Sequence, residues 1–472
     1  MVDVRKKQAQ LLGLVPIGKF VFSHEDALAY KRRTEDLLSR MGIRYVSVDG
    51  VIPDGMVRDQ SHVNPVVAHM KRQGIDGVFM PHCNFGTEGA CGMIGKKLGV
   101  PVLLWGPRDE TPLPDGTRLR DTLCGLFASS KVLHKLGVPF TYIENCRMDD
   151  LRLEQGIRDF MAVANVVKGM RTMRIGQVGT RIDFFWTCII NESELLERFG
   201  IEVVPIDMIS IVRDTKARAA SNREAYSDEI ESLKESISFE GFDTMDAVVN
   251  TLAFRDELLS RADELGLTAF AVESFMSICE ELGAMVEFSL AEVTEQGIPA
   301  ATETDIHGAV SSVLLQRAGF DESPTFLADL TIRHPERDDA VLLWHCGFPL
   351  GLRHKQAPAS VGPHWILPGI QPGSCHWRLK DGPITVCRFD GDRGDYRLVA
   401  GEGHTVEGPE TQNVYCWMAV DDWPAWERTF IEGPYIHHVA CAYGNYAGIL
   451  GEASRYIEGL TFETAAKPLM PR

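Results

Sequence analysis

Four short stretches in the second half of the chain each place a potential metal ligand in an apolar setting. The ligands are Glu303, Asp329, His345 and the adjacent pair His437 and His438. Carboxylate oxygens and imidazole nitrogens, with no cysteines at zinc-like spacing, suit Mn²⁺ or another divalent cation such as Mg²⁺ or Co²⁺ better than a structural zinc. If the four stretches converge, the sequence predicts a cation site that acts on an oxygen-rich substrate.

Glu303 stands between an apolar run over residues 297–301 and an expected helix over residues 305–318. Such a junction of strand and helix is where α/β sheets carry functional groups, because packed elements hold the side chain on both sides. The alternative is a role confined to the helix terminus, since Thr302-x-x-Asp305 resembles a capping box. Asp305 also competes with Glu303 as the functional carboxylate.

Asp329 and the histidines occupy strand-like stretches. Asp329 interrupts an apolar strand, where a buried carboxylate must be paired or bound to a metal, and a salt bridge to an arginine is the alternative. His345 ends another apolar strand, where simple hydrogen bonding is the alternative. His437 and His438 are neighbours on an extended chain, where adjacent side chains point to opposite sides, so we expect one ring to reach the metal and the other to face a substrate or a carboxylate.

The elements that must position these residues follow two patterns. Residues 1–160 and 161–325 alternate short apolar strands with amphipathic helices, which predicts two doubly wound α/β domains with parallel sheets. Residues 326–472 carry short strands with many Gly, Pro and Trp residues, which predicts a mostly antiparallel β domain with a closing helix. We therefore expect an α/β protein of three domains, with Glu303 in the second.

Composition narrows the partners. The chain has 472 residues, and its 48 Lys and Arg against 66 Asp and Glu give a formal net charge of −18, which disfavours nucleic acid and anionic lipid. We find no signal-peptide pattern and no apolar span of about 18 residues. The 11 cysteines are scattered singly, as is typical of buried thiols in a reducing compartment. We expect a cytoplasmic protein that binds neither nucleic acid nor membrane.

Three motifs together resemble the L-fucose isomerase and L-arabinose isomerase superfamily. They are Gly297-Ile298-Pro299-Ala300-Ala301-Thr302-Glu303-Thr304-Asp305, Phe326-Leu327-Ala328-Asp329 and His437-His438. Their order and spacing match the family, and the resemblance covers most of the chain. It implies two N-terminal α/β domains, a C-terminal β-rich domain and an aldose–ketose isomerase activity.

The resemblance also implies roles for individual residues. Glu303 and Asp329 correspond to the family's carboxylates that bind Mn²⁺ and serve as the acid/base pair, and His438 corresponds to its late histidine ligand. His345 matches a ligand of the arabinose isomerases, whereas fucose isomerases carry Asn there. His437 is then expected to contact the substrate.

Further substrate contacts are implied for the first domain. In the family, loops of this domain approach the active site of a neighbouring subunit, so the resemblance implies a homo-oligomer, a trimer or a hexamer. Phe85 and Asn84 lie in the stretch that corresponds to an aromatic-bearing substrate loop. Lys19 stands where the family uses arginine.

The function predicted from these observations is a metal-dependent aldose–ketose isomerase acting on a free, non-phosphorylated sugar through a cis-enediol. The reaction needs a cation to stabilise charge on the substrate oxygens and two carboxylates to move protons. Phosphorylated sugars are disfavoured because no glycine-rich phosphate loop is present. Two alternatives are a metal-dependent lyase or aldolase on a polyhydroxylated substrate, and a non-catalytic sugar-binding protein of the same fold.

Overall fold

The computed structural model describes residues 10–275, 277–367 and 369–466, and the chain divides into two compact units. The first unit comprises residues 8–168 and the second contains residues 169–472. The expected second and third domains both lie in the second unit, and their separation into two domains stays a prediction.

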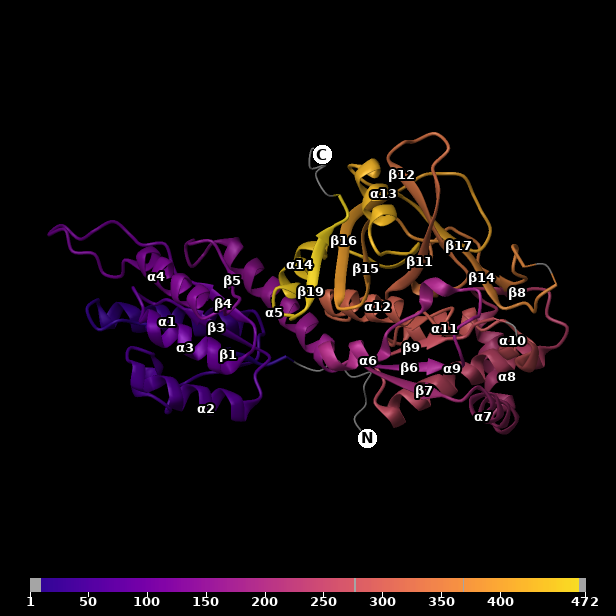
Figure 1. Cartoon of the computed structure of the whole chain (residues 1–472), viewed down its shortest axis with the longest axis horizontal. Helices are drawn as coiled ribbons and strands as arrows, with labels where there is room; N and C mark the ends of the chain where they lie inside the picture. The colour runs from indigo at the N-terminus through magenta and orange to yellow at the C-terminus, as the bar shows by residue number, and fades with distance from the viewer. Residues whose placement is uncertain (1–9, 276, 368, 467–472) are drawn as a thin grey trace. The chain divides into compact units, whose positions relative to one another are not determined.

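The described residues of the first unit form a five-stranded parallel sheet in the order β2-β1-β3-β4-β5, flanked by helices (Figure 1). Its strands are β1 (Leu12–Leu14), β2 (Tyr45–Val46), β3 (Gly77–Pro81), β4 (Val102–Trp105) and β5 (Thr141–Tyr142). Its helices are α1 (His24–Arg40), α2 (Val63–Gln73), α3 (Glu88–Leu98), α4 (Thr122–Lys135) and α5 (Leu151–Arg171), the last of which crosses the boundary between the units. β3 and β4 are buried along their whole length, as is typical of parallel strands covered on both faces.

The described residues of the second unit begin with a four-stranded parallel sheet in the order β10-β9-β6-β7. Its strands are β6 (Arg174–Val178), β7 (Glu202–Ile206), β9 (Ala269–Val272) and β10 (Ala300–Ala301). The helices of this region are α6 (Glu192–Glu194), α7 (Met208–Ser221), α8 (Arg223–Leu233), α9 (Met245–Leu265), α10 (Ser277–Leu282), α11 (Glu287–Glu295) and α12 (Ile306–Ala318).

The rest of the second unit contains an antiparallel barrel. Six strands close it in the order β16-β15-β18-β11-β12-β17, because β17 pairs with β16 as well as with β12. They are β11 (Phe326–Arg333), β12 (Ala340–His345), β15 (Pro383–Asp392), β16 (Asp395–Val406), β17 (Val414–Ala419) and β18 (His438–Tyr443). The sheet extends through β8 (Ser238–Phe239), β13 (Ser360–Gly362), β14 (Ser374–Arg378) and β19 (Leu460–Thr464), and the region also holds α13 (Trp423–Glu432) and α14 (Ala447–Ser454).

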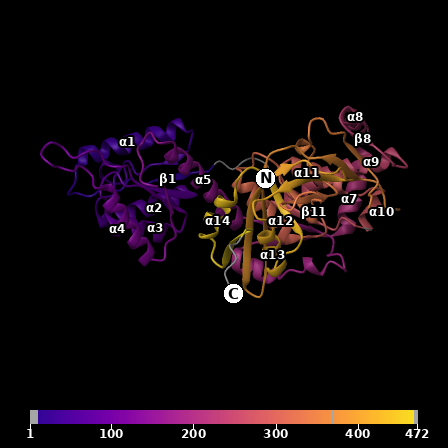
Figure 2. The ribbon, with the colours of Figure 1, turned by 90° about the horizontal axis from the view of Figure 1, so that it is seen from above.

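Helix α12 lies between the parallel sheet and the barrel. It contacts β9 on one side and β15 and β18 on the other (Figures 1 and 2). The sequence predicted one apolar face for this helix, but its polar residues are buried as well, among them Ser311 and Ser312. A helix buried all round belongs to the interior of a protein. The turn that precedes α12, residues 302–305, therefore lies next to the barrel strands.

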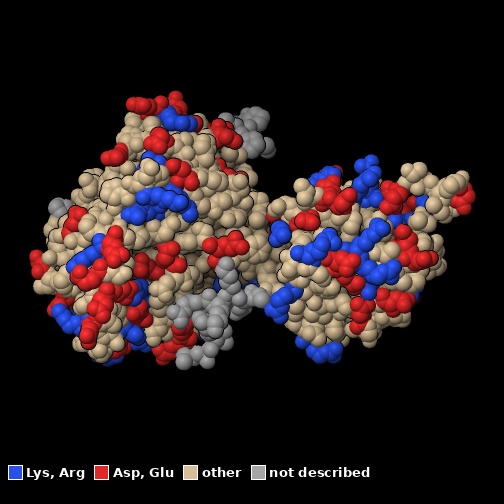
Figure 3. Space-filling view, turned by 180° about the vertical axis from the view of Figure 1, so that it is seen from behind, with Lys and Arg blue, Asp and Glu red and all other residues tan. Residues whose placement is uncertain are grey.

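The predicted fold class is confirmed, since both parallel sheets and the mostly antiparallel β region are present. All 11 cysteines are free, and Cys124 is the one that is exposed. On the face shown in Figure 3, acidic and basic side chains interleave. None of the helices within the described residues combines the length and the apolar composition that crossing a membrane requires.

Candidate metal centre

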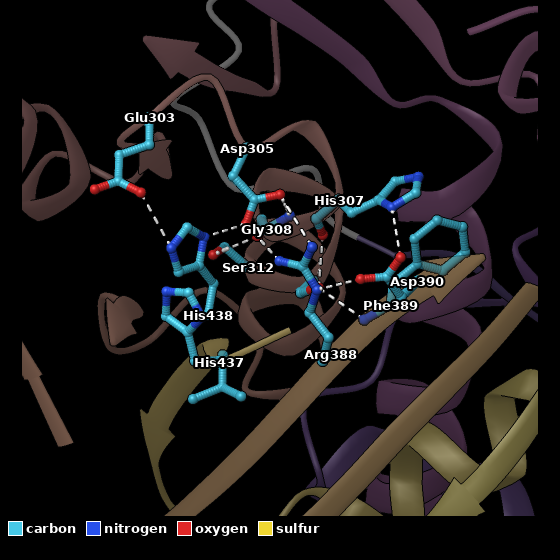
Figure 4. Close-up of polar contacts among 12 residues, drawn as sticks. Glu303, Asp305, His307, Gly308, Ser312, Arg388, Phe389, Asp390, His437 and His438 are labelled. Atoms are coloured by element: carbon cyan, nitrogen blue, oxygen red, sulfur yellow. Dashed lines mark hydrogen bonds and ion pairs between the residues drawn. The ribbon is translucent and has the colours of Figure 1, made fainter. Parts of the chain in front are cut away.

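The structure brings Glu303, Asp329 and His438 together from three separate elements. Glu303 follows β10, Asp329 lies in β11, and His438 is the first residue of β18, directly opposite Asp329 in the strand pairing. His438 Nε2 lies 3.1 Å from Glu303 Oε2 and 3.7 Å from Asp329 Oδ1. Figure 4 shows the side chain of Glu303 pointing towards the imidazole of His438.

Three buried polar atoms meet at this point without a hydrogen bond from any described residue. They are Glu303 Oε2, Asp329 Oδ1 and His438 Nε2. Glu303 Oε2 and His438 Nε2 are close enough for an ion pair, but their orientation does not make a hydrogen bond. Buried polar atoms without partners are costly, and both carboxylate oxygens lie within 4 Å of His438 Nε2, so a cation bound beside this nitrogen would give them a partner. Two carboxylate oxygens and one imidazole nitrogen fit Mn²⁺ or a similar divalent ion.

The turn that presents Glu303 has an unusual backbone. Glu303 and Thr304 have φ angles of 59° and 56°, in the left-handed region that residues with a side chain rarely adopt. Three contacts hold it: Glu303 N donates to Ser274 Oγ, Thr304 N donates to Val272 O, and Thr304 Oγ1 donates to Thr180 O. Strain of this kind gathers at functional sites, where the surroundings must enforce it.

A proton on His438 offsets part of the negative charge of the centre. Burial alone would raise the pKa of Glu303, but the imidazole of His438 holds that pKa below its usual value. Burial alone would lower the pKa of His438, but its polar contacts with Asp305, Cys188 and Glu303 hold that pKa well above the usual value. A divalent cation bound at His438 Nε2 would take the place of this proton.

His345 borders the centre, with its ring centroid 6.4 Å from that of His438. Its Nδ1 accepts a hydrogen bond from the backbone N–H of Cys346, 2.8 Å away, and its Nε2 lies 3.3 Å from Thr302 Oγ1. In a neutral ring that accepts at Nδ1, Nε2 carries the hydrogen and donates. This arrangement makes His345 a donor to Thr302, and its predicted ligation of the metal stays a prediction.

Two local expectations from the sequence are wrong. Asp305 itself caps α12 by accepting from Gly308 N at 2.9 Å, so Thr302 does not begin a capping box. The rings of His437 and His438 do not point to opposite sides either, because their centroids are 4.4 Å apart. His437 precedes β18, where the chain does not follow the alternation of a strand. His437 Nε2 instead reaches to within 4.0 Å of Asp329 Oδ1.

Two groups of three potential ligands share His438. One consists of Asp329, His437 and His438, and the other of Cys188, Asp305 and His438, whose Nδ1 lies 3.0 Å from Asp305 Oδ2. Asp305 is already neutralised there, because Arg388 forms an ion pair with it through both terminal nitrogens. Burial alone would raise the pKa of Asp305, but Arg388 and then His438 hold it far below its usual value. A cation beside Asp305 would have to displace a buried arginine, so the Nε2 side of His438 is the better candidate site for a metal.

Arg388 and Cys188 are site residues that sequence reasoning missed. Arg388 interrupts the apolar run 384–389 in β15, and a charge inside such a run was the available signal. The salt bridge expected as an alternative for Asp329 does not form with it, since Arg388 pairs with Asp305 and Asp390. Cys188 ends a 3₁₀ turn over Trp186–Cys188 and carried no signal of its own.

Glu287 is a further buried carboxyl group beside the centre. It lies in the first turn of α11, is 1% exposed, and its Oε2 has no hydrogen-bond partner among the described residues. Burial raises the pKa of Glu287 to about 8, and the charge of Glu303 adds to this effect. Glu287 is therefore a neutral acid at pH 7 and does not add to the charge of the site.

The remaining predicted site residues lie in the first unit. Lys19 Nζ lies 4.4 Å above the ring of Phe85 and 3.3 Å from Glu88 Oε2. Asn84 is 1% exposed, and its amide bonds to the backbone of Lys19, Ser23 and Gly86. Asn84 thus holds the loop that presents Lys19. Their contact with a substrate stays a prediction.

The fold and the centre define a class of protein, an α/β protein with a cluster of carboxylates and histidines beside a β-barrel. Comparison with known proteins agrees. The family model "Fucose/sulfoquinovose isomerase, N-terminal domain" matches residues 13–171, and the model "L-fucose isomerase, C-terminal domain" matches residues 367–461. The chain belongs to the fucose isomerase-like family, which confirms the resemblance found in the sequence, and it is an isomerase.

Curated relatives align over most of their length. A sulfoquinovose isomerase of Alkalicoccus urumqiensis is 24% identical over 410 residues, which cover 84% of this chain and 86% of that protein. Those of Priestia aryabhattai and Priestia megaterium (strain ATCC 12872 / QMB1551) are 25% identical over 450 residues, which cover 94% of this chain and 96% of each. Among solved structures, a periplasmic solute binding protein of Actinobacillus succinogenes 130z with bound D-allose matches at 12% identity and a TM-score of 0.18. The match covers 67% of this chain and 94% of that one, and this TM-score is too low to support a structural relationship.

Proposed function

We propose that the chain is a Mn²⁺-dependent aldose–ketose isomerase in which Glu303 and Asp329 form the acid/base pair. The observation that carries the proposal is the convergence of Glu303 Oε2, Asp329 Oδ1 and His438 Nε2, three buried atoms with no hydrogen-bond partner among the described residues. Glu303, Asp329 and His438 would hold the cation. Once bound, it would stabilise negative charge on the two substrate oxygens beside the reacting carbons.

The chemistry needs a proton removed from C2 of the aldose and returned at C1 through a cis-enediol, while the hydroxyl proton of O2 is lost and O1 gains one. Glu303 suits the role of a base, because the lowered pKa keeps its carboxylate ionised at neutral pH. Asp329 faces the same point from β11, so the pair can act on one substrate. Which carboxylate takes the C2 proton is left to experiment, and the assignment is to the pair.

The substrate we propose is a sugar without a phosphate group, and sulfoquinovose is the first candidate because three relatives carry that name. Recognition of its anionic group needs a cationic partner. Arg388 is not free for this task, since it is 0% exposed and paired with Asp305 and Asp390. Lys19 in the first unit is 26% exposed at its side chain and fits the role predicted from the sequence.

The test is incubation of the Mn²⁺-loaded protein in deuterated water with sulfoquinovose, L-fucose, L-arabinose and D-glucose, followed by NMR. We expect one ketose to form and deuterium to enter C2 of the recovered aldose, because the abstracted proton exchanges with solvent in part. Products shortened by carbon–carbon cleavage would instead identify a lyase. Binding of a sugar without metal-dependent turnover of any of the four would contradict the proposal and favour a sugar-binding protein.

A further inference from the structure

A line of buried charged groups continues behind His438, away from the centre. His438 contacts Asp305, Asp305 pairs with Arg388, and Arg388 pairs with Asp390, as Figure 4 shows. His307 ends the line through its Nδ1, 3.1 Å from Asp390 Oδ1. The groups come from α12, β15 and β18, elements far apart in the sequence.

Asp305 is fixed on every side. Its Oδ1 accepts from Gly308 N at 2.9 Å and from Arg388 Nη2 at 3.1 Å, and its Oδ2 accepts from Arg388 Nη1. The one remaining contact is His438 Nδ1, 3.0 Å from Oδ2. Asp305 is 0% exposed, so water cannot replace any of these partners. The Asp305 carboxylate thus fixes the position of His438 Nδ1, and it has no oxygen left to bind a metal.

This contact decides which nitrogen of His438 is free. An ionised carboxylate accepts hydrogen bonds only, so Nδ1 must carry a hydrogen. When a neutral ring donates from Nδ1, the lone pair lies on Nε2, the nitrogen that faces Glu303 and Asp329. Arg388 contributes by keeping Asp305 ionised and by fixing its plane through two parallel contacts.

We propose that Asp305 and Arg388 are positioning residues that hold His438 with its Nε2 lone pair directed at the cation. The inference rests on the proposed function, because it requires a metal at that nitrogen. A purely structural role does not explain the arrangement as well, since buried ion pairs add little to stability compared with apolar residues of similar volume. Carboxylates that accept from a ligating histidine raise its affinity for the metal.

The experiment compares Mn²⁺ binding by the full-length wild type and Asp305→Asn, followed by the EPR signal of free Mn²⁺. We expect the wild type to bind one Mn²⁺ per chain. Asp305→Asn should still bind one at saturation, with a dissociation constant about 10- to 100-fold higher. A structural defect would instead lower the number of sites and leave the affinity of the folded fraction unchanged, so the two readouts separate the roles.

Two further variants keep the test decisive. Asp305→Asn leaves the buried Arg388 with Asp390 but without the Asp305 carboxylate, so the double variant Asp305→Asn/Arg388→Gln is measured as well and should fold with the same loss of affinity. The matched control is Asp256→Asn on α9, which also loses a contact with a buried arginine, Arg255, but does not touch His438. The control should bind Mn²⁺ like the wild type.

The outcomes are distinct. If a folded Asp305→Asn or the double variant binds Mn²⁺ within threefold of the wild type, the positioning role is overturned while the proposed function stands. If the control weakens binding as much as Asp305→Asn does, the loss is a general effect of stability and the inference is again overturned. If the wild type itself binds no Mn²⁺, the proposed function falls and the inference falls with it.

Discussion

The turn after β3 in the first unit and the turn after β10 in the second occupy equivalent places, since each follows the carboxyl end of a parallel strand. The first contains His82, which is 0% exposed, and the second faces His438, which is 1% exposed. His82 has neutral partners, Ser129 Oγ at 2.7 Å and Met80 O at 3.3 Å. His438 lies between two carboxylates.

The two histidines differ in charge for this reason. Burial lowers the pKa of His82 to about 4, so its ring is neutral at pH 7. The carboxylates around His438 hold its pKa well above the usual value although burial opposes them. A buried histidine at a strand end is therefore not by itself a sign of a site. The sign is a set of ionised partners together with polar atoms that no described residue satisfies.

The largest effect should come from removing the carboxylates of the centre in the second unit. Glu303→Gln and Asp329→Asn should each lower turnover about 10³-fold or more, because each removes a proton-transfer group. The assay is steady-state conversion of the preferred sugar at saturating Mn²⁺. Asp338→Asn, on the exposed loop between β11 and β12, is the control and should keep full activity. Near wild-type turnover of either variant would end the acid/base assignment.

Glu287 should make the free energy of unfolding depend on pH. Its folded-state pKa of about 8 lies above the usual value of 4.5, so the unfolded state releases the proton first as the pH rises. Stability should therefore fall between pH 5 and pH 7.5, by about 3 kcal/mol from this group. Glu287→Gln should remove that slope in urea unfolding curves measured at both pH values. An unchanged slope would show that Glu287 is ionised in the folded protein.

His82 should act in the opposite pH range. Its folded-state pKa of about 4 lies below the usual value of 6.5, so the unfolded state takes up a proton first as the pH falls. Its contribution is complete above pH 6.5 and should decrease by about 2 kcal/mol between pH 6 and pH 4.5. His82→Gln should flatten this dependence in urea unfolding of the full chain, whereas His134→Gln, at an exposed position in the same unit, should not.

The smallest effect is expected at Lys19. Its ion pair with Glu88 is partly exposed, so Lys19→Ala should change the free energy of unfolding by less than about 1 kcal/mol. If Lys19 recognises an anionic sugar, KM for sulfoquinovose should rise while KM for an uncharged sugar of the panel stays the same. Equal changes in both KM values would remove Lys19 from the binding site.

Much of the architecture could be read from the sequence because it depends on local patterns. Alternating apolar strands and amphipathic helices predicted the two parallel sheets, and short strands separated by Gly and Pro predicted the β region. The closure of the barrel could not be predicted in this way. It depends on pairing between β16 and β17, whose register follows from packing within the whole barrel.

The centre shows the same limit. Glu303 and Asp329 could be found because a carboxylate inside an apolar stretch needs a partner. Asp305 and Arg388 are 83 residues apart, and neither local sequence indicates that the two side chains form an ion pair. The relative placement of the rings of His437 and His438 was wrong for a related reason, since strand alternation was assumed one residue before β18 begins. A single sequence shows which positions carry candidate site residues more readily than it shows which of these residues contact one another.

The left-handed turn at Glu303 and Thr304 has a consequence for protein engineering. Glycine adopts those backbone angles at almost no cost, so a design procedure guided by conformational preference would select it at either position. Glycine at 303 would relieve local strain and in the same step delete the carboxylate that we propose for proton transfer. Thermostable variants should accordingly be sought away from residue 303, where the proposed function sets greater robustness against activity.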